Sequence, residues 1–235
     1  MFVSQSSGVR EENKGQPCKL IYQGCLERDL PVEIYKSVPE DKEVDKMKQW
    51  SEREFLQQDI WYHATEDFYV KDILKDGVIA DINADVELDF GFGFYLTPSF
   101  DWAKKYSEGY SAPRILEYHF TPESLLESAS TYKFFGELNT EFAEFVFNNR
   151  MYFEKYDSKC VHTYDFVGGV MSDGNQPVDF ERFRNGLISK EELFRRICIP
   201  KEDWQIVIHS QTMCNKLKKP FAIHDLKGGI EYADR

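Results

Sequence analysis

Two short segments of the sequence carry residue types that suit the binding of a polar ligand. In the first, residues 60–62 are apolar and are followed by His63, Ala64 and Thr65. A short apolar run of this kind is typical of a buried strand. We therefore expect His63 at the C-terminal end of that strand, where it can present its ring to a ligand.

The second segment, DFGFGFYLTPSFDWAKKY, covers residues 89–106. Gly91 and Gly93 permit the backbone to pass close to a ligand, and the aromatic residues around them favour an extended chain. Pro98 is expected to stop this strand before residues 101–106 turn helical. The pattern therefore predicts two ligand-facing strand ends.

The order of five motifs resembles a known group of enzymes. The two segments are similar to the nicotinamide-binding half of ADP-ribosyltransferases of the diphtheria-toxin and poly(ADP-ribose)-polymerase type, whose first motifs are H-G-[ST] and F-G-x-G-[IF]-Y. The chain resembles still more closely the mostly bacterial family called domain of unknown function 3990. The motifs YHAT, DFGFGFYLT, FAEFVFNNR, YDFVGGVMSD and WQIVIHS occur in that order within residues 60–223.

The resemblance implies cleavage of the bond between nicotinamide and ribose in NAD. Such a site must hold the nicotinamide, fix the ribose hydroxyls and stabilise the positive charge that develops on the ribose. By similarity, His63 would bind a hydroxyl of the adenosine ribose, the backbone of Ala64 would hold the carboxamide, and Thr65 would support this turn. Relatives usually have glycine in place of Ala64, so its methyl group narrows the expected pocket. The alternative for His63 is a core histidine satisfied by the protein.

Two tyrosines are expected to enclose the nicotinamide. By similarity, Tyr95 belongs to the second motif, and Tyr106 matches the second ring that sandwiches nicotinamide in polymerase-type enzymes. Stacked rings contribute on the order of 1 kcal/mol beyond burial. Gly93 and Thr97 complete the NAD-binding residues expected in this segment. Core packing is the alternative for Tyr106, and Ala103, which replaces a serine of the polymerases, argues against a full polymerase.

The third catalytic position is expected at Gln205 or Glu144. Polymerase-type relatives have glutamate where this chain has Gln205, whose amide can orient hydroxyls but carries no charge. Glu144 lies where the closest family often has an acid, although its place on the helix is also typical of a solvated residue. Arg150 is a candidate for pyrophosphate binding, with a surface ion pair as the alternative. The resemblance also marks Asp165 and Asp173, which flank an expected glycine turn. The full catalytic set implied by the resemblance is His63, Tyr95, Glu144 and Gln205.

The composition argues against several other classes of protein. With 29 basic and 41 acidic residues, the net charge of -12 opposes a general nucleic-acid surface. The five cysteines form no CxxC pair and the histidines have no close ligand spacing, so we expect free thiols and no metal. The glycines at 91 and 93 lack the third glycine and the βαβ setting of a Rossmann fingerprint.

No targeting or membrane segment is expected. Residues 1–17 are polar, and no apolar run approaches the length of about eighteen residues that a membrane helix needs. We expect a cytoplasmic protein, or an effector or toxin delivered into the cytosol of another cell, without a standard signal peptide.

The expected strands alternate with helices but do not form a regular series of βαβ units, which predicts an α+β fold. The resemblance implies a split mixed β-sheet core with surrounding helices. We expect a mobile N-terminus at 1–17, a partly helical support region at 18–56 and a catalytic domain at 57–235. The expected helices cover 68–74, 140–152 and 179–197, the last broken near Asn185, and the expected strands cover 114–120, 164–170 and 204–209.

These expectations converge on a mono-ADP-ribosyltransferase with NAD as co-substrate and a protein as acceptor. The acidic surface favours an acceptor with a basic recognition patch. Two alternatives stay open. One is a catalytically silent module that binds an NAD-like ligand or a protein, and the other is an NAD glycohydrolase.

Overall fold

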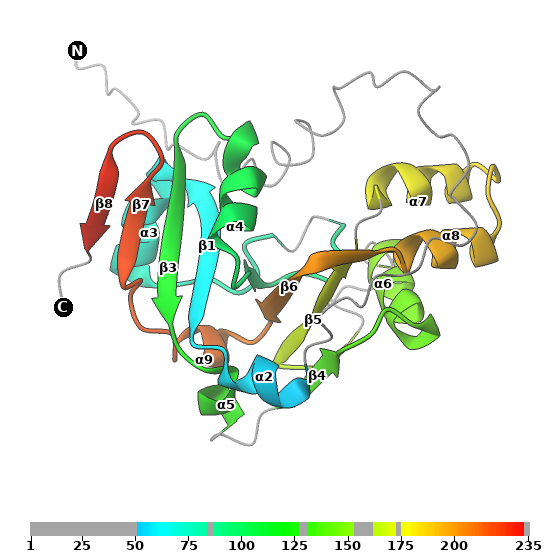
Figure 1. Cartoon of the computed structure of the whole chain (residues 1–235), viewed down its shortest axis with the longest axis horizontal. Coiled ribbons are helices and arrows are strands. Elements are labelled where there is room, and N and C mark those ends of the chain that lie inside the picture. Colours follow the sequence, from blue (N-terminus) through cyan, green and yellow to red (C-terminus); the bar gives the residue numbers. More distant parts are fainter. Residues whose placement is uncertain (1–50, 84–86, 127–130, 153–161, 173–174, 233–235) are drawn as a thin grey trace, which may run out of the picture. The chain divides into compact units, whose positions relative to one another are not determined.

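The structure is a computed structural model that describes residues 51–83, 87–126, 131–152, 162–172 and 175–232 (Figure 1). All of these stretches belong to one compact unit, Asp41–Arg235. The segment predicted to be mobile, 1–17, and nearly all of the predicted support region, 18–56, lie outside the described residues, as does Asp173. Among the described cysteines, Cys198 and Cys214 are free thiols.

The first sheet is antiparallel throughout, with strand order β1-β3-β7-β8. Its strands are β1 (Ile60–Glu66), β3 (Pro113–His119), β7 (Ala222–Asp225) and β8 (Gly229–Tyr232). Every residue of β1 pairs with β3, which extends the strand beyond its apolar start. His63 therefore lies in the middle of β1. The expectation that it ends the strand was wrong, because backbone pairing continues through the polar residues.

The second sheet has the strand order β2-β6-β5-β4, in which only β4 and β5 are parallel. Its strands are β2 (Phe94–Leu96), β6 (Pro200–Ile208), β5 (Phe166–Ser172) and β4 (Tyr132–Phe135). Gly168 and Gly169 lie inside β5, so the turn predicted there is wrong. Their missing side chains make room for neighbours, since a Cβ on Gly168 would lie 2.1 Å from Phe55 Cζ and one on Gly169 would lie 2.8 Å from Phe135 Cβ.

Short helices connect and flank the strands, which confirms the α+β class. They are α2 (Glu52–Gln57), α3 (Asp67–Asp76), α4 (Phe100–Tyr106), the 3-10 helix η2 (Ser107–Gly109), α5 (Pro122–Leu125), α6 (Thr140–Tyr152), α7 (Gln176–Arg184), α8 (Lys190–Ile197) and α9 (Gln211–Cys214). The predicted helices at 68–74 and 140–152 are confirmed as α3 and α6. The predicted helical region at 179–197 corresponds to α7, which begins earlier at Gln176, and α8, with the break beginning at Asn185. No helix among the described residues is long and apolar enough to span a bilayer.

Side-chain caps determine where the helices next to the site begin. Pro98 lies between β2 and α4, and the Ser99 hydroxyl then accepts a hydrogen bond from the N–H of Trp102 (3.1 Å), so α4 begins at Phe100. At α6 the cap is Asn139, whose Oδ1 accepts from Phe142 N–H (3.1 Å). The cap therefore lies one residue before the start of α6 at Thr140.

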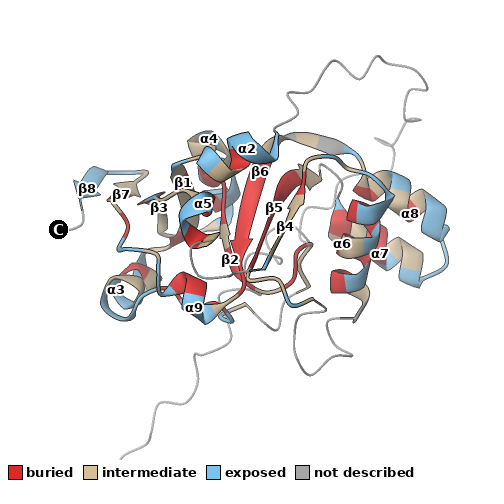
Figure 2. Ribbon diagram, turned by 90° about the horizontal axis from the view of Figure 1, so that it is seen from below, coloured by how far each residue is buried: buried red, intermediate tan, exposed pale blue. Residues whose placement is uncertain are grey.

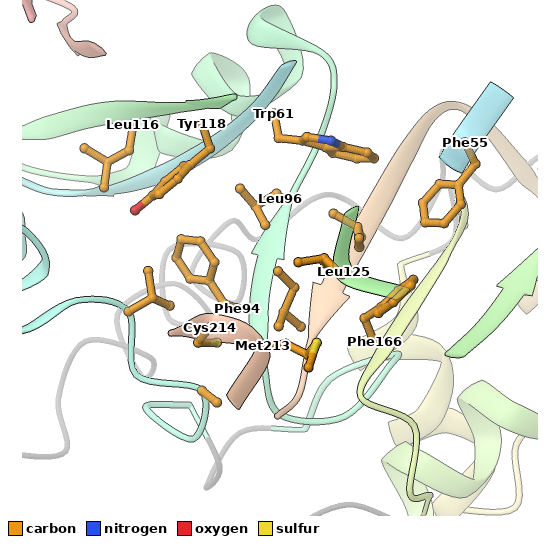
Figure 3. Packing of buried hydrophobic residues seen from close by; sticks show 14 of the residues in the cluster. Phe55, Trp61, Phe94, Leu96, Leu116, Tyr118, Leu125, Phe166, Met213 and Cys214 are labelled. Carbon is orange, nitrogen blue, oxygen red and sulfur yellow. The ribbon is translucent and has the colours of Figure 1, made fainter. Parts of the chain in front are cut away.

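Two apolar clusters lie against opposite faces of the second sheet. Alternation along β6 places Ile206 and Ile208 in the first cluster and Val207 in the second. In the same way, Phe94 and Leu96 of β2 face the first cluster, while Tyr95 packs against the second. Figure 3 shows the first cluster, in which both of these β2 residues lie near side chains of β1 and β3. Strands β5 and β6 are consequently buried over most of their length (Figure 2).

Candidate functional site

Strands β1 and β2 meet at one point and then separate. Within the described residues, the two strands share a single bridge, in which Tyr62 N–H donates to Thr97 O (2.8 Å) and Thr97 N–H donates to Tyr62 O (3.0 Å). Backbone groups of residues two apart on a strand point the same way. The N–H and C=O groups of Ala64 on β1 and Tyr95 on β2 therefore face an opening between the strands, which we name the strand divergence.

His63 extends its ring into the strand divergence. Its Nδ1–H donates to the carbonyl oxygen of Tyr95 (2.8 Å), and its ring lies 4.3 Å from that of Phe94. Because a carbonyl only accepts hydrogen bonds, Nε2 is the unprotonated nitrogen. The residue is only half-buried, but protein atoms surround the imidazole, and this burial lowers the pKa of His63 to about 4. At neutral pH His63 is therefore uncharged, and Nε2 has no partner among the described residues.

Ala64 keeps a donor and an acceptor that the β1–β3 ladder does not use. Backbone groups alternate in direction along a strand, and those of Tyr62 point to Thr97 of the other sheet. The N–H and C=O of Ala64, two residues on, therefore also point away from β3 and toward the strand divergence. In the described part of the chain, no strand pairs with Ala64 on that side. Thr65, the next residue, is buried. The arrangement leaves one complete backbone donor–acceptor pair beside the His63 ring.

Three residues form a row across the strands next to this backbone pair. Leu96 pairs with Ile206, which brings Thr97 beside Gln205, and Gln205 itself pairs with Gly169. Paired residues of antiparallel strands project to the same face. Gln205 is 7% exposed, and its side-chain amide has no hydrogen bond within the described residues. On that flank Gly169 has no side chain, and Phe135 packs against it, since a Cβ on Gly169 would lie 2.8 Å from Phe135 Cβ.

The two predicted stacking tyrosines lie on consecutive elements. Tyr95 projects from β2 to the face that carries Gln205, since its partner on β6 is Val207. The Tyr95 hydroxyl donates to Gly91 O (2.7 Å) and accepts from Phe90 N–H (3.2 Å), so the ring is held in place. Tyr106 is the last residue of α4 and is 49% exposed.

The carboxylates lie in two different environments. Glu144 is exposed on α6, on the side away from the buried Phe142 and Val146. Sequence reasoning overlooked Asp203, which lies on β6 two residues before Gln205, where the pairing of β6 with β5 shifts register. Asp203 is half-buried. The alternation of polar residues along β6 was the signal that could have identified it.

Arg150 belongs to a buried ionic network. It is 4% exposed, its Nε donates to a carboxylate oxygen of Asp89, and its guanidinium lies 5.4 Å from the centre of the Phe180 ring. The neighbouring Glu87 forms an ion pair with Arg184 (2.9 Å). Because Asp89 and Phe180 already occupy its guanidinium, Arg150 holds residues 87–89 against α6 and is not placed as a free pyrophosphate ligand.

Comparison with known families places this geometry in context. A family model described as "Protein of unknown function (DUF3990)" matches residues 62–219. The chain belongs to this family. The DUF3990 match begins in β1 and ends after α9, so it includes every predicted site residue from His63 to Gln205. Comparison with curated proteins and with solved structures finds no match.

Sequence reasoning missed three further polar residues of the DUF3990 region that contact the chain before β2. Asn83, His162 and His209 all bind backbone atoms of residues 90–93. A histidine directly after the apolar run of β6 was the only local signal for His209. No cluster of three or more His, Cys, Asp or Glu side chains among the described residues is arranged to hold a metal ion.

Proposed function

We propose that this DUF3990 protein is a mono-ADP-ribosyltransferase, which cleaves the nicotinamide–ribose bond of NAD and transfers ADP-ribose to a protein side chain. In this proposal the two sheets that separate beyond Tyr62 and Thr97 correspond to the split mixed sheet of ADP-ribosyltransferases. NAD is the co-substrate and binds at the strand divergence.

The free backbone pair of Ala64 is the observation that carries the proposal. A primary carboxamide has one acceptor oxygen and two N–H donors, so it can pair with the N–H and C=O of a single residue as a neighbouring strand would. Nicotinamide carries such a group on a flat ring. With its carboxamide on Ala64, the ring would extend toward the face that carries Tyr95 and the end of α4, where Tyr106 is exposed.

The neutral imidazole of His63 fits the binding of a ribose hydroxyl. Its Nδ1–H is engaged by the Tyr95 carbonyl, so Nε2 is an acceptor for a hydroxyl proton. Gln205, with an amide that has no partner in the described residues, can orient a second hydroxyl from the neighbouring strand. These two contacts would hold the riboses of NAD in place while the nicotinamide departs.

The transfer itself needs two changes at C1′ of the ribose. Nicotinamide leaves with the electron pair of the C–N bond, and a nucleophilic atom of the acceptor, such as an arginine nitrogen or a carboxylate oxygen, supplies the new pair. A nitrogen nucleophile then loses its proton. The positive charge on the ribose is best stabilised by a carboxylate, for which Asp203 and Glu144 are the candidates.

A catalytically silent NAD-binding module is the second candidate function. It is favoured by Gln205, because this residue carries no charge at the place where polymerase-type relatives have a glutamate. Under this alternative the chain would bind NAD with the same residues but would release no nicotinamide.

Titration calorimetry with NAD tests the binding on which both candidates depend. We expect one NAD per chain, competition by free nicotinamide, and at least about tenfold weaker binding for His63→Ala, because a buried polar contact is lost. His119→Ala is the matched control, since this histidine of β3 has a 41% exposed side chain. Equal affinity of the His63 and His119 variants would remove the strand divergence as the binding site.

A further inference from the structure

The backbone carbonyls of residues 89–93 are all bound by side chains. These five consecutive carbonyls precede β2 and receive donors from side chains at positions between 83 and 209. The bonds are Asn149 Nδ2 to Asp89 O (3.2 Å), His162 Nε2 to Phe90 O (3.1 Å), Tyr95 Oη to Gly91 O (2.7 Å), His209 Nδ1 to Phe92 O, and Asn83 Nδ2 to Gly93 O (3.0 Å). In surface loops, backbone carbonyls usually form hydrogen bonds with water instead. Because side chains bind every carbonyl of residues 89–93, we name this segment the clamped loop.

The clamped loop determines the position of β2. It runs straight into Phe94 and Tyr95, and the carbonyl of Tyr95 is the group that orients His63. Gly93 leaves little freedom at the junction, because a Cβ there would lie 2.5 Å from Val207 Cγ1 and 2.9 Å from Ile208 O. Any shift of the loop would therefore move the backbone that faces Ala64 across the strand divergence.

Asn83 acts on this segment as a substitute for a strand. Its Oδ1 accepts from Gly93 N–H (2.8 Å) and its Nδ2 donates to Gly93 O (3.0 Å), which is the pairing a neighbouring strand would provide. Because Gly93 is satisfied by Asn83 and the Tyr95 carbonyl by His63, β1 cannot continue to pair with β2 past the bridge. The two side chains thus keep the strands apart.

We propose that His209 and Asn83 are positioning residues for the reaction, because they hold the clamped loop in the place that keeps the strand divergence open. This inference rests on the proposed function for its catalytic meaning. Neither residue contacts the ligand, and both act through the backbone of residues 93–95.

The protonation of a histidine pair controls one end of this arrangement. The rings of His162 and His209 lie 4.5 Å apart, and Nε2 of His209 is buried without a partner among the described residues. A second proton on His209 would thus place an unpaired charge in the interior beside another imidazole. Burial lowers the pKa of His209 to about 3, with His162 contributing, and burial also lowers the pKa of His162.

The charged and titratable groups around the two histidines do not favour their protonation, because the nearby carboxylates bind other partners. From the segment before β5, the Tyr164 ring lies 5.4 Å from the His162 ring, and Asp165 directs its carboxylate to the N–H of Thr131 (2.8 Å) while its carbonyl accepts from His209 N–H. Across the clamped loop, the carboxylate of Asp89 is bound by Arg150 of α6. If the clamped loop detached, the pKa of both histidines would return to the ordinary value of about 6.5. The bound conformation of the loop therefore loses stability as the pH falls below about 6.5, because the detached loop then takes up protons.

Hydrogen exchange followed by mass spectrometry tests the positioning role without any ligand. In His209→Leu we expect the exchange rate of amides in peptides covering residues 88–96 to rise at least tenfold at pH 7. The exchange rates of β5 and β6 should stay unchanged. His209→Asn is the matched rescue, because its Nδ2 lies at the same number of bonds from the backbone as Nδ1 of histidine, and it should restore slow exchange. Unchanged exchange of these peptides in His209→Leu would overturn the inference.

Two further readouts separate positioning from general stability. NAD affinity should fall at least fivefold in His209→Leu and recover in His209→Asn. In the unmodified protein, loop exchange corrected for the intrinsic rate should quicken between pH 6.5 and 5, and less so in His209→Asn. A flat pH profile in the unmodified protein would count against the histidine pair.

Asn83→Ala provides a second route if His209→Leu loosens the whole chain. It leaves both histidines in place and should raise exchange only near Gly93 while weakening NAD binding at least fivefold. Slow exchange in this variant would overturn the role of Asn83. If the unmodified protein binds no NAD, the proposed function fails, whereas the exchange measurements still decide whether these residues hold the loop.

Discussion

In the proposed function, His63 contributes to the binding of NAD rather than to acid catalysis. Its Nδ1–H is engaged by the carbonyl of Tyr95, and burial lowers its pKa to about 4, so at neutral pH it has no proton to give to a leaving group. A neutral Nε2 accepts a hydroxyl proton well but stabilises no positive charge. In the proposed reaction the charge on the ribose therefore needs a carboxylate, and the half-buried Asp203, two residues from Gln205 on β6, is a stronger candidate than the exposed Glu144.

A pair of amide substitutions distinguishes these carboxylates. We expect Asp203→Asn to lower kcat by about 10²-fold with little change in NAD affinity, as is typical when one group that stabilises developing charge is removed. Glu144→Gln should leave kcat within about twofold, because this side chain is exposed on α6. Steady-state kinetics of nicotinamide release measures both. A large loss only in Glu144→Gln would assign the charge to α6 instead.

At the scale of elements, the connection into β2 is the most constrained part of the site. Gly91 has φ +78° and Gly93 has φ +155°, and residues that carry a side chain rarely adopt either backbone conformation. Gly93 also lies in van der Waals contact with the end of β6. The position of the short strand β2 is thus determined by the preceding segment, which contains Gly91 and Gly93, as much as by the pairing of β2 with β6.

Substitution of Gly93 should test this constraint. We expect Gly93→Ala to destabilise the fold by about 2–4 kcal/mol, because it combines a strained φ with overpacking against Val207 and Ile208. Gly109→Ala is the matched control, since nothing lies within 4 Å of its Cβ position, and its stability should change by less than about 1 kcal/mol. Urea denaturation compares the two variants. Equal stability of both would show that Gly93 is not under strain.

The regular elements could be predicted from local pattern, but the site could not be completed that way. Helix α3 follows from its apolar spacing and Gly77, and β3 from alternation before Pro122. The partners that hold β2 were out of reach, because His209 binds Phe92 across 117 positions of sequence. The carboxylate partner of Arg150 was out of reach for the same reason, since Asp89 lies 61 positions away.

At the scale of the whole molecule, the net charge of -12 bears on which acceptor the proposed reaction would use. An acidic surface attracts a basic partner and repels polyanions, so we propose a protein acceptor with a basic patch around the modified side chain. The DUF3990 match over residues 62–219 contains the complete candidate site.

The most direct test of the central claim is mass spectrometry of a cell lysate incubated with the purified protein and NAD, with released nicotinamide measured in the same samples. We predict nicotinamide release together with ADP-ribose added to defined peptides, and loss of both in His63→Ala. Nicotinamide release without modified peptides would assign the protein as a glycohydrolase. An unmodified lysate with no released nicotinamide would contradict the account.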